Sequence, residues 1–270
     1  MTETLLSDNG RPLGILDSGV GGLSTLRYIR QQLPHENLLY IADQAHVPYG
    51  PRSLTEIRHL TEQLVQFLLA QQVKMVVVAC NTASAAALTH LRQTFPYLPF
   101  VGMEPAVKPG AAQTRNGKVG VLATSGTFSS ERYAHLTARF AQGVTVYEDP
   151  CRGLVELIEA GQVNGAATEQ LLRRCLSPML AAGVDTIVLG CTHYPFVLPL
   201  IEKIVGPQVT IIDPSPAVAR QTERVLQQHN LLSDNGNPGQ TALFTTGDGE
   251  QLSYLAEALL GGKWAATAVP

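Results

Sequence analysis

Charged residues are scarce in this sequence. Of its 270 residues, 19 are lysine or arginine and 22 are aspartate or glutamate, so 15% of the chain is charged, well below the roughly 25% of an average soluble domain. The two signs are interspersed and the net charge is −3. Because no basic cluster is available to bind a phosphate backbone or an anionic lipid surface, neither nucleic acid nor a membrane is an expected partner.

Long hydrophobic runs and an export signal are also missing. No apolar run reaches the length of about 18 residues that a membrane span requires, and residues 1–9 are polar. Cysteines are too few and too scattered for a disulfide framework. They are Cys80, Cys151, Cys175 and Cys191. We therefore expect a cytoplasmic protein with free thiols, in which the residues before Leu13 form a frayed end or serve regulation.

Hydrophobic residues, in contrast, make up 45% of the chain, which is enough for one large core or two smaller ones. They form short β-branched runs that alternate with helical patterns, as is typical of an α/β fold with parallel sheets covered on both faces. Strands are predicted at residues 13–16, 38–42, 73–79, 100–103, 119–123, 144–147, 184–189, 209–212 and 242–245.

The clearest helix signal covers residues 53–70. Ser53 and Glu56 have the spacing of a capping box, which marks the start of a helix. Large apolar residues then recur every three or four positions and are expected on one buried face. They are Leu54, Ile57, Leu60, Leu64, Phe67 and Leu68.

Two strand ends occur twice in the chain. Residues 14–19 (GILDSG) resemble 120–126 (GVLATSG), and residues 76–82 (VVVACNT) resemble 187–193 (IVLGCTH). The offsets, 14 to 120 and 76 to 187, are 106 and 111 residues. Near-equal offsets indicate two similar α/β units. A proline-rich crossing near residues 96–109 would link them, and residues 213–216 (DPSP) would form a return crossing.

Cys80 and Cys191 follow equivalent strands, at the edge of the sheet where open α/β folds bind ligands. Small polar residues that suit a helix start follow each thiol, and a helix N-terminus lowers a thiol pKa. Buried packing is the alternative for any single cysteine. A thiolate and an opposed thiol can invert a stereocentre by general acid–base catalysis, without metal or cofactor. Asp17 and His193, also at strand ends, could manage their protons, although an Asx turn or a hydrogen-bonded histidine is the simpler role for each.

The loop of residues 17–22 (DSGVGG) leaves a second function class open. Its backbone N–H groups suit a carboxylate or a phosphate. The pattern Gly19-x-Gly21-x-x-Ser24 nearly matches a dinucleotide fingerprint, whose acidic residue would be Asp43. The chain would then be a nucleotide-binding module with idle thiols.

Metal and pyridoxal chemistry have little support. Cys191-x-His193 lacks the paired ligand spacing of zinc sites, and none of the five lysines occupies a strand-end motif. A decarboxylase of a similar fold would be expected to need only one cysteine, so the presence of both Cys80 and Cys191 argues against that function.

Taken together, the motifs resemble the glutamate racemase family of cofactor-independent amino-acid racemases. They occur in family order, at residues 14–22, 48–50, 79–83, 190–195, 212–215 and 246–248. The resemblance implies two α/β domains with mainly parallel sheets that face each other across the active site. The first would comprise residues 1–100 plus 211–270, and the second residues 101–210.

The resemblance also implies roles for individual residues. Cys80 would act on the Cα–H of the D-enantiomer with help from Asp17, and Cys191 on that of the L-enantiomer with help from His193. Glu159 would support His193. Substrate-binding residues implied in the same way are Asp17, Ser18, Pro48, Tyr49, Gly50, Asn81, Thr82, Thr124 and Thr192.

The sequence departs from the family pattern beside Glu159, because Arg152 and Glu156 stand where many relatives have proline. A solvated position on a helix is therefore the alternative for Glu159. The function implied is the interconversion of L- and D-glutamate without a cofactor, which would supply D-glutamate for peptidoglycan. A racemase of aspartate, of another amino acid or of a hydantoin stays open. So do a homodimer and regulation by a cell-wall precursor.

Overall fold

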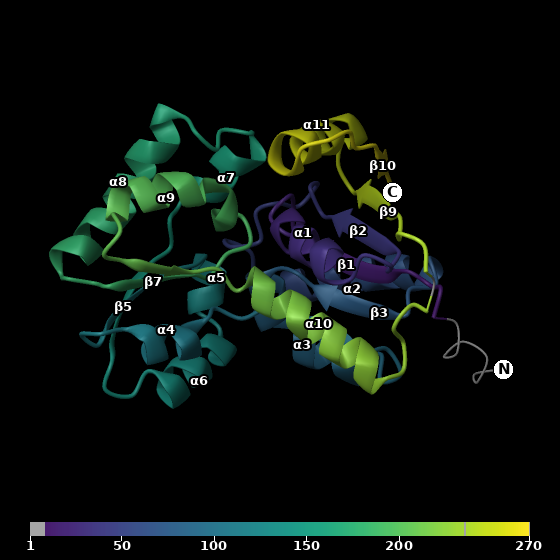
Figure 1. Cartoon of the computed structure of the whole chain (residues 1–270), viewed down its shortest axis with the longest axis horizontal. Helices are drawn as coiled ribbons and strands as arrows, with labels where there is room; N and C mark the ends of the chain where they lie inside the picture. Colours follow the sequence, from purple (N-terminus) through teal and green to yellow (C-terminus); the bar gives the residue numbers. More distant parts are fainter. Residues whose placement is uncertain (1–8, 235, 270) are drawn as a thin grey trace.

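The computed structural model describes residues 9–234 and 236–269. They form two lobes that lie side by side, each built on a parallel sheet (Figure 1). The predicted α/β fold is therefore confirmed. Of the residues expected to form a frayed or regulatory end, 1–8 lie outside the described part of the chain.

The larger sheet has the strand order β10-β9-β2-β1-β3-β4. Its strands are β1 (Leu13–Asp17), β2 (Leu38–Ala42), β3 (Met75–Val78), β4 (Phe100–Gly102), β9 (Thr241–Thr245) and β10 (Ala266–Ala268). One face packs against α1 (Leu23–Gln32), α10 (Ser215–Gln228) and α11 (Gly249–Leu260), and the other against α2 (Leu54–Ala70) and α3 (Asn81–Thr94).

The smaller sheet has the order β6-β5-β7-β8. Its strands are β5 (Lys118–Leu122), β6 (Thr145–Asp149), β7 (Thr186–Leu189) and β8 (Thr210–Ile212). Helices α7 (Leu154–Glu159), α8 (Ala166–Ala181) and α9 (Leu198–Val205) lie on one side, α9 directly after the 3₁₀ turn η1 (Tyr194–Val197). Helices α4 (Val107–Gln113), α5 (Ser125–Phe128) and α6 (Glu131–Phe140) complete the lobe.

The two sheets share a connection pattern, since β2-β1-β3-β4 in one corresponds to β6-β5-β7-β8 in the other. This correspondence pairs β1 with β5 and β3 with β7, as the repeated strand ends predict. After β8 the chain returns to the first lobe as α10. The division into residues 1–100 plus 211–270 and 101–210 stays a prediction. Its limits fall inside β4 and β8, so a division drawn along the sheets would move each limit by two residues, to 102 and 212.

Helix α2 shows how the local signals operate. The Ser53 hydroxyl accepts the backbone N–H of Glu56 at 3.2 Å, which is the Ser53 half of the predicted capping box, whereas the Glu56 carboxylate pairs with Arg52. Most of the predicted apolar face is buried, but Leu54 is 40% exposed, contrary to expectation. Leu54 stands in the first turn, which projects beyond the core cluster that the rest of the helix joins.

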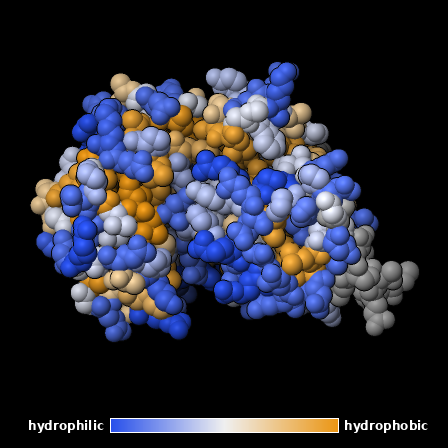
Figure 2. Space-filling model, in the orientation of Figure 1, coloured by the Kyte–Doolittle hydropathy of each residue, from blue (hydrophilic) through white to orange (hydrophobic). Residues whose placement is uncertain are grey.

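Surface hydrophobicity is uneven between the lobes. On the face shown in Figure 2, hydrophobic residues gather on the left lobe, where Figure 1 draws α9 and β7. The edge strand β8 of the smaller sheet is half-buried. Within residues 9–234 and 236–269, none of the helices combines the length and apolar character of a membrane span.

Candidate active site

A narrow cavity lies between the lobes, at the carboxyl ends of the central strands of both sheets. Cys80 follows β3 and Cys191 follows β7, and both thiols line this cavity. Every residue predicted to bind substrate lines it as well, except Asp17, which is fully buried beside it. The topology therefore brings predicted residues from five separate stretches of the sequence to one place, as expected where parallel strands end.

The Cys80 thiol caps the N-terminus of α3. Its Sγ accepts the backbone N–H of Ala83 at 3.4 Å and lies 3.8 Å from the Ser18 hydroxyl. Burial nevertheless raises the pKa of Cys80 to about 12, and the negative charge of Asp17 adds to the shift. The expectation that the helix terminus would lower this pKa is therefore wrong, because burial outweighs the N–H contacts. Cys80 stands in the cavity as a neutral thiol.

Asp17 lies behind the Cys80 thiol. Its carboxylate accepts the backbone N–H of Gly19 at 2.9 Å and the Thr192 hydroxyl, from the other lobe, at 3.1 Å. Burial raises the pKa of Asp17 to about 6, against the opposing influence of His193. A carboxyl group with this pKa can exchange a proton near neutral pH.

The Cys191 thiol is paired with His193. The Sγ atom lies 3.7 Å from Nδ1 of His193, and the other ring nitrogen, Nε2, lies 2.6 Å from a carboxylate oxygen of Glu159. Burial acts to lower the pKa of His193, but its hydrogen bonds with Cys191 and Glu159 outweigh burial and raise that pKa well above its ordinary value. The histidine is therefore an imidazolium held between the Cys191 sulfur and the Glu159 carboxylate.

Glu159 is buried at the end of α7, so the solvated position is wrong and the contact with His193 is present. The same oxygen, Oε1, accepts the backbone N–H of Val20 in the first lobe at 2.8 Å. Gln44 donates to the second oxygen at 3.4 Å. The carboxylate thus joins the lobes and holds His193 at the same time.

The cavity walls carry unsatisfied polar atoms. Both side-chain amide atoms of Asn81 are buried and have no hydrogen-bond partner in the described part of the chain. Val155 also lines the cavity, and the sequence motifs did not predict it. The cavity has a volume of about 10 Å³, which is roughly enough for one water molecule. The lobes must therefore part for a larger molecule to bind.

The comparisons with known proteins agree with this geometry. A family model described as Asp/Glu/Hydantoin racemase matches residues 22–222. This chain belongs to that family. The family assignment made from the motifs is confirmed, and it places the racemase among the isomerases.

Similar proteins match over nearly their whole length. The glutamate racemase of Ectopseudomonas mendocina is 52% identical over 257 residues, which are 95% of this chain and 97% of that protein. The structure of a glutamate racemase isoform of Bacillus anthracis has a TM-score of 0.88 at 35% identity and covers 97% of this chain and 98% of its own. Escherichia coli glutamate racemase, solved with L-glutamate and the activator UDP-MurNAc-ala, has a TM-score of 0.83 at 32% identity and covers 96% and 97%.

The glycine-rich loop of this racemase is covered by the second lobe. A Cβ atom on Gly21 would lie 2.5 Å from both His193 Nδ1 and Thr192 Oγ1, and one on Gly19 would meet the Glu159 carboxylate. A phosphate has no space against these glycines. The dinucleotide pattern therefore does not describe what the loop contacts in this structure.

The other two cysteines lie in the core and do not line the cavity. Cys151 and Cys175 are buried, and their Sγ atoms lie within 4.8 Å of each other and of a carboxylate oxygen of Asp149. In the described residues, this is the group close enough to hold a metal ion. A hydrogen bond between the thiols, together with burial, raises the pKa of Cys151 well above its ordinary value. Cys151 therefore packs as a neutral thiol, which is a poor state for metal binding.

Proposed function

We propose that this racemase interconverts L-glutamate and D-glutamate by proton transfer at Cα between Cys80 and Cys191, without a cofactor. The observation that carries the proposal is that one thiol from each lobe lines the same closed cavity. The substrate follows from the names of the relatives, which are glutamate racemases, and from the L-glutamate bound to the Escherichia coli enzyme.

The ionisation of the cavity favours one starting state. In the proposed starting state for L-glutamate, the imidazolium of His193 donates from Nδ1 to a Cys191 thiolate, while Cys80 is a thiol. With L-glutamate, the Cys191 thiolate takes the Cα proton and the electron pair spreads into the α-carboxylate. The Cys80 thiol then gives its proton to the opposite face, and D-glutamate forms.

The reverse direction begins with a Cys80 thiolate. Asp17 is the carboxylate whose charge acts most strongly on this thiol, and with its pKa near 6 it is the proposed acceptor for the Cys80 proton. Cys191 then protonates the carbanion. Glu159 keeps His193 oriented and charged throughout. The two half-reactions use the same groups in opposite protonation states.

Stabilisation of the carbanion must come from the cavity walls. The unpartnered amide of Asn81 and the hydroxyl groups of Thr82 and Thr192 are placed to bind the substrate carboxylates and ammonium. In a closed cavity that excludes water, such hydrogen bonds are stronger than in solution.

The wider role of the reaction is part of the same proposal. D-Glutamate would serve peptidoglycan synthesis in the cytoplasm, where the four free thiols would stay reduced. The activator bound to the Escherichia coli relative supports regulation by a cell-wall precursor. A homodimer stays a prediction.

Incubation in D₂O tests the proposal. We expect purified protein, free of pyridoxal phosphate, to invert each glutamate enantiomer and to place deuterium at Cα. Cys80→Ala and Cys191→Ala should each abolish inversion while the circular dichroism spectrum is unchanged. If either single variant still inverted glutamate and exchanged its Cα proton, the two-thiol mechanism would be refuted. Turnover of aspartate but not of glutamate would be consistent with proton transfer between two thiols but would refute glutamate as the substrate.

A further inference from the structure

Thr245 is the last residue of β9, and Thr246 follows it, on the segment that returns to the first lobe. The Thr246 hydroxyl donates to the Asp43 carboxylate at 2.7 Å and accepts the backbone N–H of Ala45 at 3.2 Å. The Thr245 hydroxyl donates to the side-chain oxygen of Gln44 at 2.9 Å. The two neighbouring hydroxyl groups therefore bind different partners.

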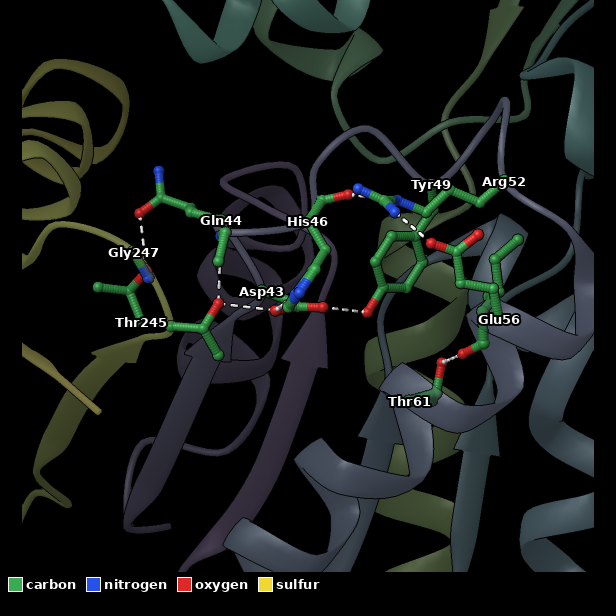
Figure 3. A network of polar contacts seen from close by, with 12 residues as sticks. Asp43, Gln44, His46, Tyr49, Arg52, Glu56, Thr61, Thr245 and Gly247 are labelled. Atoms are coloured by element: carbon green, nitrogen blue, oxygen red, sulfur yellow. Dashed lines mark hydrogen bonds and ion pairs between the residues drawn. The ribbon is translucent and has the colours of Figure 1, made fainter. Parts of the chain in front are cut away.

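Thr246 is connected to the Cys80 half of the cavity through Asp43. This carboxylate is 2% exposed, and its second oxygen accepts the Tyr49 hydroxyl at 2.6 Å (Figure 3). Burial and the Asp43 charge raise the pKa of Tyr49 above its ordinary value, so the phenol stays a donor. The ring of Tyr49 lines the cavity and packs in the same cluster as Cys80.

Thr245 is connected to the Cys191 half through Gln44. With its oxygen held by Thr245, the Gln44 amide directs its N–H₂ group to Glu159, the carboxylate that holds His193. Thr245 is fully buried and also accepts the backbone N–H of Gly247 at 3.0 Å. Its hydroxyl therefore fixes both the amide orientation and the turn after the strand.

We propose that the two threonines are positioning residues for opposite halves of the reaction, Thr246 for proton transfer at Cys80 and Thr245 for proton transfer at Cys191. The inference rests on the proposed racemase function. It gives a role to the Thr246-Gly247-Asp248 motif, which contains no thiol and does not line the cavity. The returning C-terminal segment thus completes the first sheet and also supports both thiols.

Overall rates cannot separate the two halves. Two enantiomers have equal free energy, so kcat/KM must be the same in both directions for every active variant. A primary isotope effect on kcat/KM, measured with glutamate deuterated at Cα, does separate them. Slowing one proton transfer makes that step more limiting. The isotope effect then rises for the enantiomer whose Cα–H that thiol breaks, and it falls for the other.

The experiment compares matched pairs of variants. For Thr246→Val we expect kcat/KM to fall about tenfold, the cost of losing a hydrogen bond to a charged group. Its isotope effect should rise with D-glutamate and fall with L-glutamate. For Thr245→Val we expect a loss of about threefold and the opposite change of the two isotope effects. Thr246→Ser and Thr245→Ser keep the hydroxyl and should restore wild-type values.

Asp185→Asn serves as the structural control. Asp185 is a buried carboxylate bonded to Thr114, Arg115 and Asn116 next to the start of β7, the end of the strand opposite Cys191. This variant should lower thermal stability without changing either isotope effect. If the isotope effects with D- and L-glutamate changed in the same way in both Val variants, or did not change, the proposal would be overturned. The threonines would then have a purely structural role. Failure of the wild-type protein to invert glutamate would instead refute the proposed function.

Discussion

Glu159 in the second lobe accepts the backbone N–H of Val20 in the first lobe at 2.8 Å. The accepting oxygen is also the one that lies 2.6 Å from Nε2 of His193. One carboxylate oxygen therefore takes part both in a contact between the lobes and in the support of the charged histidine. Parting of the lobes would break the contact with Val20, whereas Glu159 and His193 lie on the same lobe.

Glu159→Gln separates the two roles of this carboxylate. The amide oxygen can still accept the Val20 N–H, but the negative charge that raises the pKa of His193 is lost. The pKa of His193 should fall toward its ordinary value, and the imidazolium should lose its proton at lower pH. We expect kcat at pH 8 to fall about tenfold or more, since a charged hydrogen bond contributes about 1.5–3 kcal/mol.

The pH profile of kcat and an NMR titration of His193 check this expectation. The alkaline limb should move to lower pH in Glu159→Gln. Glu156→Gln, which changes an exposed acid on the same helix, is the matched control and should leave the profile unchanged. An unchanged limb in Glu159→Gln would mean that another group keeps His193 charged.

Asp17→Asn should stabilise the protein at neutral pH while it impairs turnover. The folded-state pKa of about 6 lies above the ordinary 3.8, so ionisation of Asp17 costs more in the folded chain than in the unfolded one. This cost is absent below pH 4, grows between pH 4 and 6, and is constant above pH 6. The variant should therefore gain about 1–3 kcal/mol over wild type above pH 6.

Urea unfolding at several pH values between 4 and 8 measures the difference. The gain of the variant should vanish toward pH 4, where the wild-type carboxyl is protonated in both states. A gain that does not depend on pH would show that ionisation of Asp17 is not its source.

Most of the fold could be predicted from local patterns. Each predicted strand lies within two residues of an observed one, because runs such as 75–78 (MVVV) are apolar on both faces. Strand β10 was missed, since Ala266–Ala268 is a short, exposed edge strand without a hydrophobic pattern. The motifs also predicted the cavity-lining residues, because the carboxyl ends of parallel strands meet.

Contacts between the lobes could not be predicted in the same way. The bond from Val20 to Glu159 joins residues 139 positions apart and depends on how the two finished lobes dock. The same holds for Val155, whose place in the wall follows from the packing of α7 rather than from a motif. The ionisation of Cys80 was predicted with the wrong sign, because sequence shows a helix start but not the depth of burial.

Gly21→Ala tests whether the closed arrangement is the catalytic one. An added Cβ would stand 2.5 Å from His193 Nδ1 and from Thr192 Oγ1, on the opposite lobe, so either His193 must move or the lobes must stay apart. We expect kcat/KM to fall by about a hundredfold, as a misplacement of about 1 Å can cause. Gly165→Ala is the control, because within the described residues nothing lies within 4 Å of its Cβ position and its φ of −79° suits alanine. Steady-state rates and thermal melting of both variants provide the measurement. A Gly21→Ala enzyme with wild-type rates would show that proton transfer does not require Thr192 and His193 to pack against this loop.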